Sequence, residues 1–331
     1  RLVSMASSDD DLKQMLAATA SDGIVVLHDG RIVFEDYANG TTADTQHIIM
    51  SATKSMTGLV AGMLKARGLL DTEALVSDYV EEVTLTAYQG ATIQQLLDMR
   101  AGIHLDEQGL RDYALATGWD PAGPGEQMGD LHSFYCAMTA PPRPHGGPFA
   151  YISANTDLLG WAIERAAEKP FADLLSELLW QPMGATHDAW LTLDPKGAPR
   201  CTGGLCMTVR DFARIGQVIA DDGKRGDTEI VPLSWIEDIA RSGDRAAWKS
   251  GEFAQGFAGM DMTYRNGWYV DNDTPQVLFA MGIHGQNLFV DRANRIVIAK
   301  VSSQAQPVDY AALPLIHRAV TEFQRLLGAK A

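Results

Sequence analysis

Cysteine is scarce in this chain: Cys136, Cys201 and Cys206 are the only three among 331 residues. Three is too few, and odd in number, for the disulfide framework of a small secreted domain. No CxxC or HExxH pairing, the spacings typical of zinc sites, occurs either. We therefore expect the three cysteines to be buried apolar side chains, and we expect no metal and no other cofactor.

Long apolar runs are also absent. The best candidate, at about 58–64, is interrupted by Gly and Lys and falls short of the roughly 18 residues that span a bilayer. We therefore predict no membrane-spanning segment. A cytoplasmic location is favoured, and a periplasmic or secreted one stays open because the chain begins with Arg1.

Positive charge is the third deficit. The chain has 27 Lys and Arg against 42 Asp and Glu, a formal charge of −15, and a pI near 4.9. Binding of nucleic acid needs clustered cations, so we expect a small-molecule ligand and no nucleic-acid partner. A hydrophobic content of 46% with 21% charged residues is typical of a globular protein of one or two domains. No sequence feature indicates an oligomeric state.

Strand patterns lie at both ends of the chain, and helix patterns lie between them. Residues 24–37 alternate around Asp29-Gly30, a pair that favours a two-residue hairpin turn. Two later runs, 276–283 and 288–303, also indicate strands, and the second indicates a hairpin about 291–294. Helices are expected over 51–67, 156–168, 171–180, 208–223 and 313–327.

This order of elements favours an α+β fold. One antiparallel sheet would form from the N- and C-terminal segments, flanked by helices, with a helical region inserted between them. We expect the sheet region to comprise 1–50 and 255–331 and the helical region 51–254, with the active site at their junction. Two Pro- and Gly-rich stretches, 120–130 and 140–148, are expected to be surface loops near a cleft.

The first chemical motif is IMSATKSMTGL, where Ser51 and Lys54 are three residues apart at the start of a predicted helix. This spacing is close to one turn, so the hydroxyl and the amine share a face, and the helix N-terminus adds a free N–H and positive potential. A serine needs an adjacent base, and a lysine accepts a proton only in its neutral form, which burial favours. SxxK is common by chance, so other segments must support it.

Two other segments give that support. The segment FAYISANTDLLGW places Tyr151, Ser153 and Asn155 just before a helix, where a tyrosine can transfer protons. The segment GIHGQNLFVD contains a glycine-flanked strand edge, where backbone can approach a ligand closely. The order SxxK, YxS/N and Gly-rich strand is the pattern of the serine β-lactamases and penicillin-recognising enzymes.

The chain resembles one branch of that group most closely. The segments SATKS, LLDMRAGI, YISANTDLLGW, GGLCMTVRDFARIG and GIHGQNLFVD are similar to the 6-aminohexanoate-dimer (nylon oligomer) hydrolases and their carboxylesterase relatives. The resemblance covers about 24–303. It implies a β-lactamase/transpeptidase-like fold of the class C type.

The resemblance also implies roles for individual residues. Ser51 would be the acylated nucleophile, Lys54 its general base, and Tyr151 the residue that passes a proton to the leaving group. The backbone N–H groups of Ser51 and Ile283 would form the oxyanion hole, with Gln286 as the alternative second donor.

The substrate loops depart from the family pattern. A tyrosine that donates to the amide nitrogen in those hydrolases corresponds to Gly109 here, with Tyr113 nearby, and an acidic residue that meets the substrate ammonium aligns with Ala114. Amide cleavage is therefore less expected than ester cleavage. Trp119 and Trp268 are candidates for pocket walls, with core packing equally open. Asn155 and His284 complete the candidate contacts, although we expect His284 to hydrogen-bond behind its strand.

We therefore predict a serine hydrolase that acts through an acyl-enzyme, first a carboxylesterase for small acyl esters and second an amidase for 6-aminohexanoate oligomers. A β-lactamase or D-alanyl-D-alanine peptidase is a weaker alternative, because MGIHG lacks the KTG-like side chains that hold a substrate carboxylate. A non-catalytic, acylated sensor or binding protein is a third hypothesis. The complete set of Ser51, Lys54 and Tyr151 argues against it.

Overall fold

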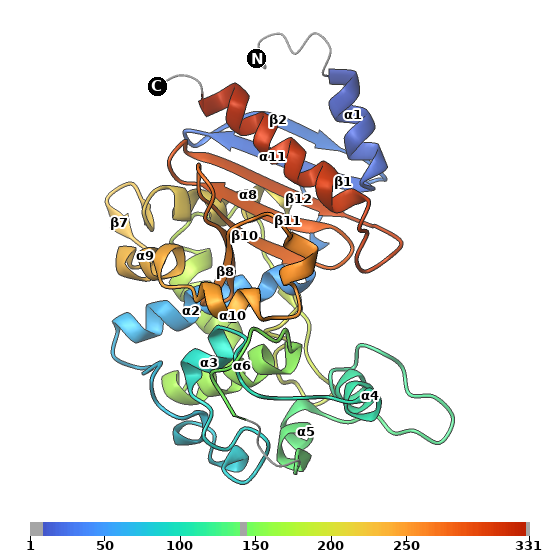
Figure 1. The fold of residues 1–331 in the computed structure, drawn as a ribbon, viewed down its shortest axis with the longest axis vertical. Helices are drawn as coiled ribbons and strands as arrows, with labels where there is room; N and C mark the ends of the chain where they lie inside the picture. The colour runs from blue at the N-terminus through green and yellow to red at the C-terminus, as the bar shows by residue number, and fades with distance from the viewer. Residues whose placement is uncertain (1–8, 140–143, 329–331) are drawn as a thin grey trace.

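The computed structural model describes residues 9–139 and 144–328, and in them seven strands form one antiparallel sheet. Its spatial order is β2-β1-β12-β11-β10-β9-β8. The N- and C-terminal strands meet inside the sheet, where β1 pairs with β12, as predicted (Figure 1). The bounds are β1 (Ser21–His28), β2 (Arg31–Tyr37), β8 (Met262–Arg265), β9 (Trp268–Asp271), β10 (Val277–Gly282), β11 (Gln286–Asp291) and β12 (Ile296–Ser302).

Two smaller sheets and the helices complete the described chain. The other strands are β3 (His47–Ile48), β4 (Trp190–Leu191), β5 (Leu205–Met207), β6 (Lys224–Arg225) and β7 (Thr228–Glu229). The longer helices are α1 (Asp9–Ala18), α2 (Thr53–Ala66), α4 (Glu107–Ala116), α6 (Ser153–Ala167), α8 (Val209–Ala220), α9 (Leu233–Arg241) and α11 (Ala312–Gly328). The shorter helices are α3 (Ile93–Leu97), α5 (Leu131–Ala137), α7 (Phe171–Leu175), α10 (Arg245–Lys249), η1 (Met50–Ala52), η2 (Val76–Asp78), η3 (Glu81–Val83), η4 (Ser176–Trp180) and η5 (Ala254–Phe257).

The predicted hairpins follow from local turn chemistry. Asp29 and Gly30 have φ of 49° and 74° in the turn between β1 and β2, the left-handed values that a tight hairpin turn requires. The expected helix at 208–223 begins at Thr208, whose side chain accepts a hydrogen bond from the backbone N–H of Asp211. The expected helix at 51–67 differs in detail, because Ser51 lies in the 3₁₀ turn η1 and the α-helix starts at Thr53.

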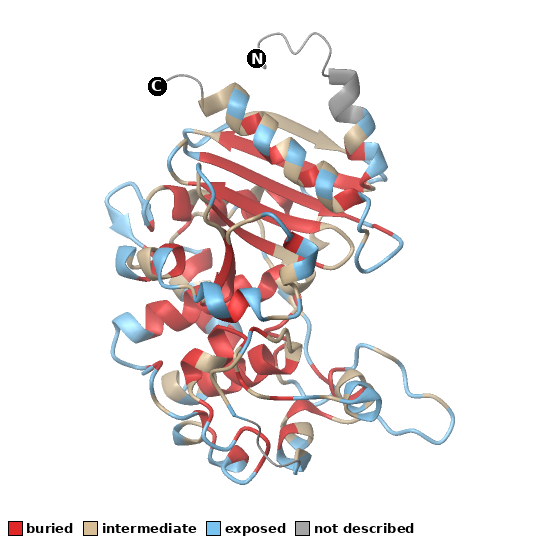
Figure 2. Cartoon of the chain, in the orientation of Figure 1, coloured by how far each residue is buried: buried red, intermediate tan, exposed pale blue. Residues whose placement is uncertain are grey.

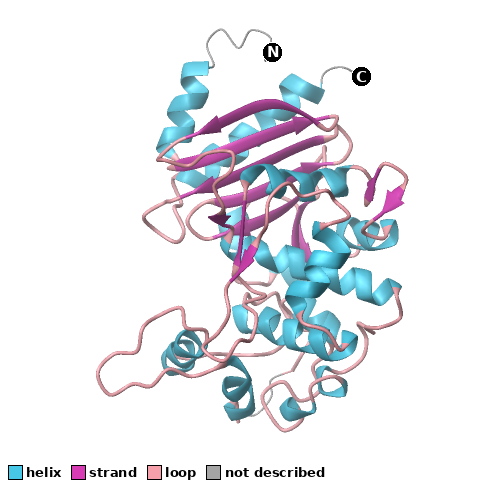
Figure 3. Ribbon diagram, turned by 180° about the vertical axis from the view of Figure 1, so that it is seen from behind, coloured by secondary structure: helices cyan, strands magenta, loops and turns pink. Residues whose placement is uncertain are grey.

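Both faces of the large sheet are covered. α8 packs on β1, β11 and β12 on one face, while α1 and α11 cover the other (Figure 1, Figure 3). Alternate side chains of β12 enter the two cores: Val297 and Ala299 face α8, and Ile296 and Ile298 face α11. The buried colouring of the central strands in Figure 2 follows from this double cover. The segment 51–254, the predicted helical region, therefore supplies one of the helices that cover the sheet, namely α8.

The central helix α2 positions the segment that contains Ser51 and Lys54. Twelve of its 14 residues are buried, which is typical of a helix in the interior of a protein rather than at its surface. The preceding turn η1 contacts β10 and β11. The Ser51 end of α2 is thereby fixed against two inner strands of the sheet.

The loop and cysteine predictions have mixed outcomes. Residues 120–130 form a mostly exposed loop beside α4, on an arm that projects from the molecule (Figure 1). In the stretch 140–148, residues 140–143 lie outside the described residues. The cysteines form no disulfide in the described part of the chain, and Cys201 is buried as expected, but Cys136 is exposed because it lies near the end of the peripheral helix α5. None of the helices described is long and apolar enough to cross a membrane.

Candidate active site

Ser51 and Lys54 meet at the start of α2. The Nζ of Lys54 lies 2.8 Å from the Oγ of Ser51 and also donates to the carbonyl oxygen of Thr202 at 3.2 Å. Lys54 is only 2% exposed, so its amine is held in a confined position next to the hydroxyl. The structure thus brings together the serine and lysine of the predicted motif.

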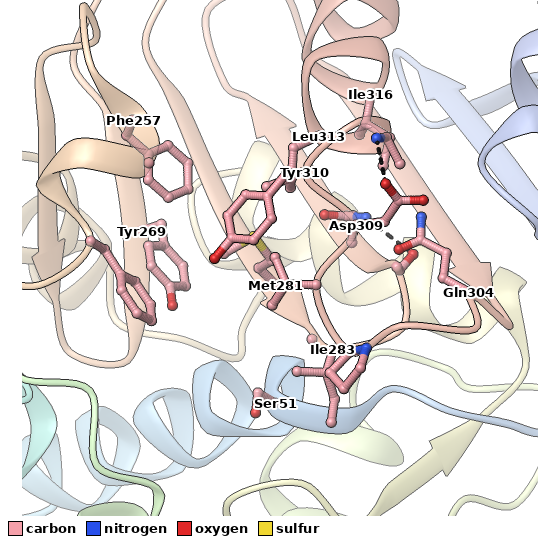
Figure 4. Close-up of a pocket in the computed structure, with 18 of the residues that line it drawn as sticks. Ser51, Phe257, Tyr269, Met281, Ile283, Gln304, Asp309, Tyr310, Leu313 and Ile316 are labelled. Atoms are coloured by element: carbon pink, nitrogen blue, oxygen red, sulfur yellow. Dashed lines mark hydrogen bonds between the residues drawn. The ribbon is translucent and has the colours of Figure 1, made fainter.

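Met50, which precedes Ser51, has an unusual backbone conformation. Its φ is 48°, a left-handed value that costs a residue other than glycine about 1–3 kcal/mol. Ser51 follows in the same 3₁₀ turn η1 and lines the cavity together with Ile283 (Figure 4). The strained residue therefore sits immediately before the candidate nucleophile.

The end of β10 passes very close to Ser51. A Cβ atom on Gly282 would lie 2.5 Å from the carbonyl oxygen of Ile49 and 3.0 Å from the backbone nitrogen of Ser51. Within the described residues, neither the N–H of Ser51 nor that of Ile283 donates a hydrogen bond to protein. Two free donors on adjoining segments are what an oxyanion hole requires.

Gln286, the alternative residue, has a side chain that is hydrogen-bonded to the backbone of its neighbours. Its buried side chain donates to the carbonyl oxygens of Ser302 at 2.7 Å, His284 at 3.2 Å and Ile283 at 3.3 Å, and its oxygen accepts from the N–H of Ser302. Gln286 therefore holds the β10–β11 turn from behind. The side chain of Gln286 is therefore not available to a substrate, and the Ile283 N–H, which has no protein acceptor among the described residues, stays the second donor that we expect.

Tyr151 lies beside the serine and lysine. The Nζ of Lys54 is 4.6 Å from the centroid of its ring, a cation–π distance. The ring stacks on Phe253 with centroids 5.2 Å apart, and the backbone N–H donates to the carboxylate of Glu252. Burial raises the pKa of nearby Tyr269 well above its usual range, and neighbouring Tyr151 raises it further. Tyr151 thus lies next to the Lys54 amine and also lines the cavity.

A buried ion pair supports Lys54 from behind. Asp157 accepts hydrogen bonds from the backbone N–H of Thr202 at 2.9 Å, from the Tyr113 hydroxyl at 2.6 Å and from Arg200 at 3.3 Å. Burial raises the pKa of the Asp157 carboxyl, and the Arg200 guanidinium opposes that shift. Because Asp157 fixes Thr202, it also fixes the carbonyl group that receives the Lys54 amine.

Ser51 and Tyr151 open into a cavity of about 540 Å³. Its walls are mostly apolar side chains from β9, β10, η5, α11 and the segment between β12 and α11, several of which are drawn in Figure 4. The charged lining residues are Glu252 and Asp309, and the described lining contains no Lys, Arg or His. The cavity is therefore suited to an apolar group without negative charge.

Three of the residues that we expected to contact the substrate make hydrogen bonds inside the protein instead. The indole N–H of fully buried Trp268 donates to the carbonyl oxygen of Ser55, so this ring is core and not a pocket wall. The side-chain oxygen of Asn155, also fully buried, accepts from the hydroxyl of Tyr88 at 2.9 Å. Tyr113 donates its hydroxyl to Asp157 and so does not replace the missing loop tyrosine.

The other three expected contacts also lie outside the cavity lining. Gly109 is in the first turn of α4, where its N–H donates to the Asp106 side chain. Trp119 follows the same helix and is 50% exposed. His284 donates from Nδ1 to the carbonyl oxygen of Gln304 at 2.6 Å, in agreement with its expected role behind the strand.

Sequence reasoning missed several residues of the site. For Thr202, the one feature of the sequence that could have indicated a role was its position directly before the GGLC motif. The cavity walls from 252–257 and 304–316 carry no motif, since they reach the site only through tertiary packing. Among the described residues, no group of three or more His, Cys, Asp or Glu side chains is arranged to hold a metal ion.

Comparison with known proteins identifies the family. The beta-lactamase family matches residues 9–321, nearly the whole chain. The chain belongs to the beta-lactamase family. Within it, a 6-aminohexanoate-dimer hydrolase of Paenarthrobacter ureafaciens is 32% identical over 315 residues, which cover 93% of this chain and 79% of that protein. The predicted resemblance is confirmed.

Solved structures of the beta-lactamase fold agree with this assignment. A Bacillus anthracis protein named for the same dimer hydrolase activity superposes with a TM-score of 0.85 at 26% identity, covering 95% of this chain and 82% of its own. A family VIII carboxylesterase has the same fold, with a TM-score of 0.66 at 19% identity and coverage of 94% and 96%. The beta-lactamase/transpeptidase-like fold and the hydrolase class are therefore confirmed.

Proposed function

We propose that this chain is a carboxylesterase for small acyl esters that works through an acyl-enzyme on Ser51. The observation that carries the proposal is the 2.8 Å approach of the Lys54 amine to the Ser51 hydroxyl at the mouth of an apolar cavity. A nucleophile within hydrogen-bond reach of a base is the arrangement that nucleophilic catalysis requires.

The proposed reaction has two halves. The Oγ of Ser51 bonds to the ester carbonyl carbon while its proton passes to neutral Lys54, and the N–H groups of Ser51 and Ile283 stabilise the oxyanion. The carbon–oxygen bond to the alcohol then breaks, and Tyr151 gives the departing oxygen a proton that Lys54 replaces. Water attacks the acyl-enzyme in the same way, and the carboxylic acid leaves as Ser51 regains its proton.

The charge of the cavity favours an ester over a β-lactam. Glu252 and Asp309 line the cavity, and the described lining has no cation to hold the carboxylate that β-lactams and D-alanyl peptides carry. The MGIHG segment offers only Met281 and Ile283 side chains at this wall. A buried carboxylate without a partner would be costly, which disfavours these substrates.

Cleavage of 6-aminohexanoate amides is the second candidate activity. The observation that favours it is the 32% identity to a 6-aminohexanoate-dimer hydrolase. It is the weaker candidate because the Tyr113 hydroxyl is occupied by Asp157 and does not reach the cavity. An amide nitrogen, which is the poorer leaving group, would then lack a donor from the arm that carries α4.

The decisive experiment compares three substrates with the wild-type chain and Ser51→Ala. We expect turnover of p-nitrophenyl butyrate, little turnover of nitrocefin and slower turnover of the linear 6-aminohexanoate dimer. Ser51→Ala should lower kcat/KM for the ester by about 10³-fold or more, with an unchanged circular dichroism spectrum. An intact-mass adduct on Ser51 should accompany turnover.

Other results would overturn the proposal. Comparable efficiency on nitrocefin would indicate a β-lactamase, and a stoichiometric burst without turnover would indicate a sensor. Near-wild-type ester turnover by Ser51→Ala would exclude Ser51 as nucleophile.

A further inference from the structure

Two buried amide side chains interrupt the apolar lining of the cavity. Asn287, on β11, is 3% exposed, and Gln304, which follows β12, is 7% exposed. Neither takes part in the chemistry proposed for Ser51. A polar group at such a depth needs a hydrogen-bond partner, so these two side chains require an explanation.

Carbonyl groups fix the orientation of both amides. The Nδ2 of Asn287 donates to the carbonyl oxygen of Gly285 at 3.1 Å, and the Nε2 of Gln304 donates to that of Thr19 at 3.2 Å. Turning either amide over would bring two oxygen atoms together. The amide oxygens of Asn287 and Gln304 therefore point away from these carbonyl groups.

The β10–β11 turn brings the two amides to the same wall of the cavity. Gly285 has a φ of 90°, and a Cβ atom there would lie 2.7 Å from the Cδ of Gln304, so only glycine leaves room for this amide. His284 binds the backbone of Gln304 twice, through its Nδ1 and through its carbonyl oxygen. His284 is thus a positioning residue for Gln304.

The side-chain oxygens of both amides are free acceptors. Among the described residues, no donor reaches the Oδ1 of Asn287 or the Oε1 of Gln304, and neither atom is sealed away from solvent. Gly285, between them, lines the same cavity. Two accessible acceptors in a wall that is mostly apolar can be satisfied by a donor on a bound molecule.

The place of this pair relative to Ser51 indicates which part of a substrate would reach it. Gly282, at the end of β10, adjoins Ser51, and Asn287 lies across from Met281 on the next strand, about 5 Å away. A chain attached to Ser51 and running along this face of the sheet would therefore pass Met281 before it reaches Asn287 and Gln304.

We propose that Asn287 and Gln304 form a subsite that selects acyl groups ending in a hydrogen-bond donor, such as an ω-hydroxyl or a primary amide. The inference rests on the proposed ester hydrolysis at Ser51. An acyl chain with a methyl end would displace water from both acceptors and leave them unpaired. Sites that pair a substrate hydroxyl discriminate strongly against analogues that lack it, for this reason.

The test compares p-nitrophenyl esters in matched pairs: 6-hydroxyhexanoate with hexanoate, 8-hydroxyoctanoate with octanoate, and 10-hydroxydecanoate with decanoate. We expect the ratio of kcat/KM, hydroxylated over plain, to reach about tenfold at one chain length and to be near unity at the others. Gln304→Met and Asn287→Leu, which keep side-chain size, should each lower the highest ratio by about three- to tenfold, mainly through KM for the hydroxylated ester.

The matched control is Gln306→Met, the same change at an exposed position of the same segment outside the cavity lining. It should keep the wild-type ratio, which separates recognition from a general disturbance of the segment. Turnover of both esters at equal efficiency for every length would overturn the subsite alone. Absence of turnover for all six esters would overturn the ester hydrolysis itself, and the subsite with it.

Discussion

At the scale of single residues, Gly282 is the position where the geometry of the site is most sensitive. Backbone atoms of Ile49 and Ser51 would lie within 3.0 Å of an added Cβ, and backbone cannot move aside as a flexible side chain can. We expect Gly282→Ala to separate β10 from Ser51, lower kcat for p-nitrophenyl butyrate about 10²-fold and destabilise the fold by about 1–3 kcal/mol. Steady-state kinetics and urea unfolding measure both effects.

Gly147→Ala is the matched control for that change. Nothing lies within 4 Å of a Cβ at Gly147, and its φ is not in the left-handed region. It should retain wild-type kinetics and stability. Equal kcat in Gly282→Ala and Gly147→Ala would contradict the close packing of β10 against Ser51.

At the scale of secondary-structure elements, Tyr113 links the projecting helix α4 to α6. Its hydroxyl donates at 2.6 Å to Asp157, a carboxylate buried with Arg200. Tyr113→Phe removes one donor from a buried charge, so we expect a loss of about 1.5–3 kcal/mol in the free energy of unfolding. Hydrolysis of the aminohexanoate dimer should fall by no more than about threefold, because the hydroxyl does not face the cavity. Unchanged stability with a large loss of amide hydrolysis would instead make Tyr113 a substrate donor.

The way in which the secondary-structure elements assemble explains which features could be predicted from the sequence. Ser51, Lys54 and Tyr151 lie in short segments with local signals, and the hairpin at Asp29-Gly30 depends on two adjacent residues, so these features were accessible. The burial of Trp268 could not be predicted in this way. A tryptophan in a strand can face either a pocket or the core, and its packing against α2 determines which of the two it faces. Asn287 and Gln304 come together only when β11, the turn at Gly285 and the segment after β12 have assembled. No periodicity or spacing in the sequence indicates that these two side chains lie together.

At the scale of the whole molecule, one buried cation couples folding to pH. Lys300, on β12, is buried beside the carbonyl oxygen of Thr19 and the hydroxyl of Ser302. Burial lowers its pKa from the usual 10.5 to about 8, although the nearby Asp22 carboxylate opposes the shift. In a chain with a net charge of −15, this lysine is one of the few cations away from solvent.

The sign of the effect follows from proton counting. Between pH 8 and 10 the folded chain has lost the Lys300 proton and the unfolded chain still holds it, so the unfolded state binds more protons and stability rises with pH. We expect Lys300 alone to raise the free energy of unfolding by about 2 kcal/mol across this window. The thiols of Cys201 and Cys206 oppose this rise, because burial raises their pKa and they keep protons in the fold that the unfolded chain loses. Above the usual tyrosine value of 10 the trend should reverse, because burial raises the pKa of Tyr264 and Tyr269 and keeps them protonated in the fold.

Urea unfolding at intervals from pH 7 to pH 10 measures this linkage. Lys300→Met should remove the contribution of this amine, so the free energy of unfolding of the wild type should rise by about 2 kcal/mol relative to that of the variant between pH 8 and pH 10. Lys224→Met, at an exposed position of β6, should keep the wild-type pH dependence. If the free energy of unfolding of Lys300→Met depends on pH in the same way as that of the wild type, the buried Lys300 amine makes no contribution to the pH dependence, and its ammonium is as well stabilised in the fold as in water.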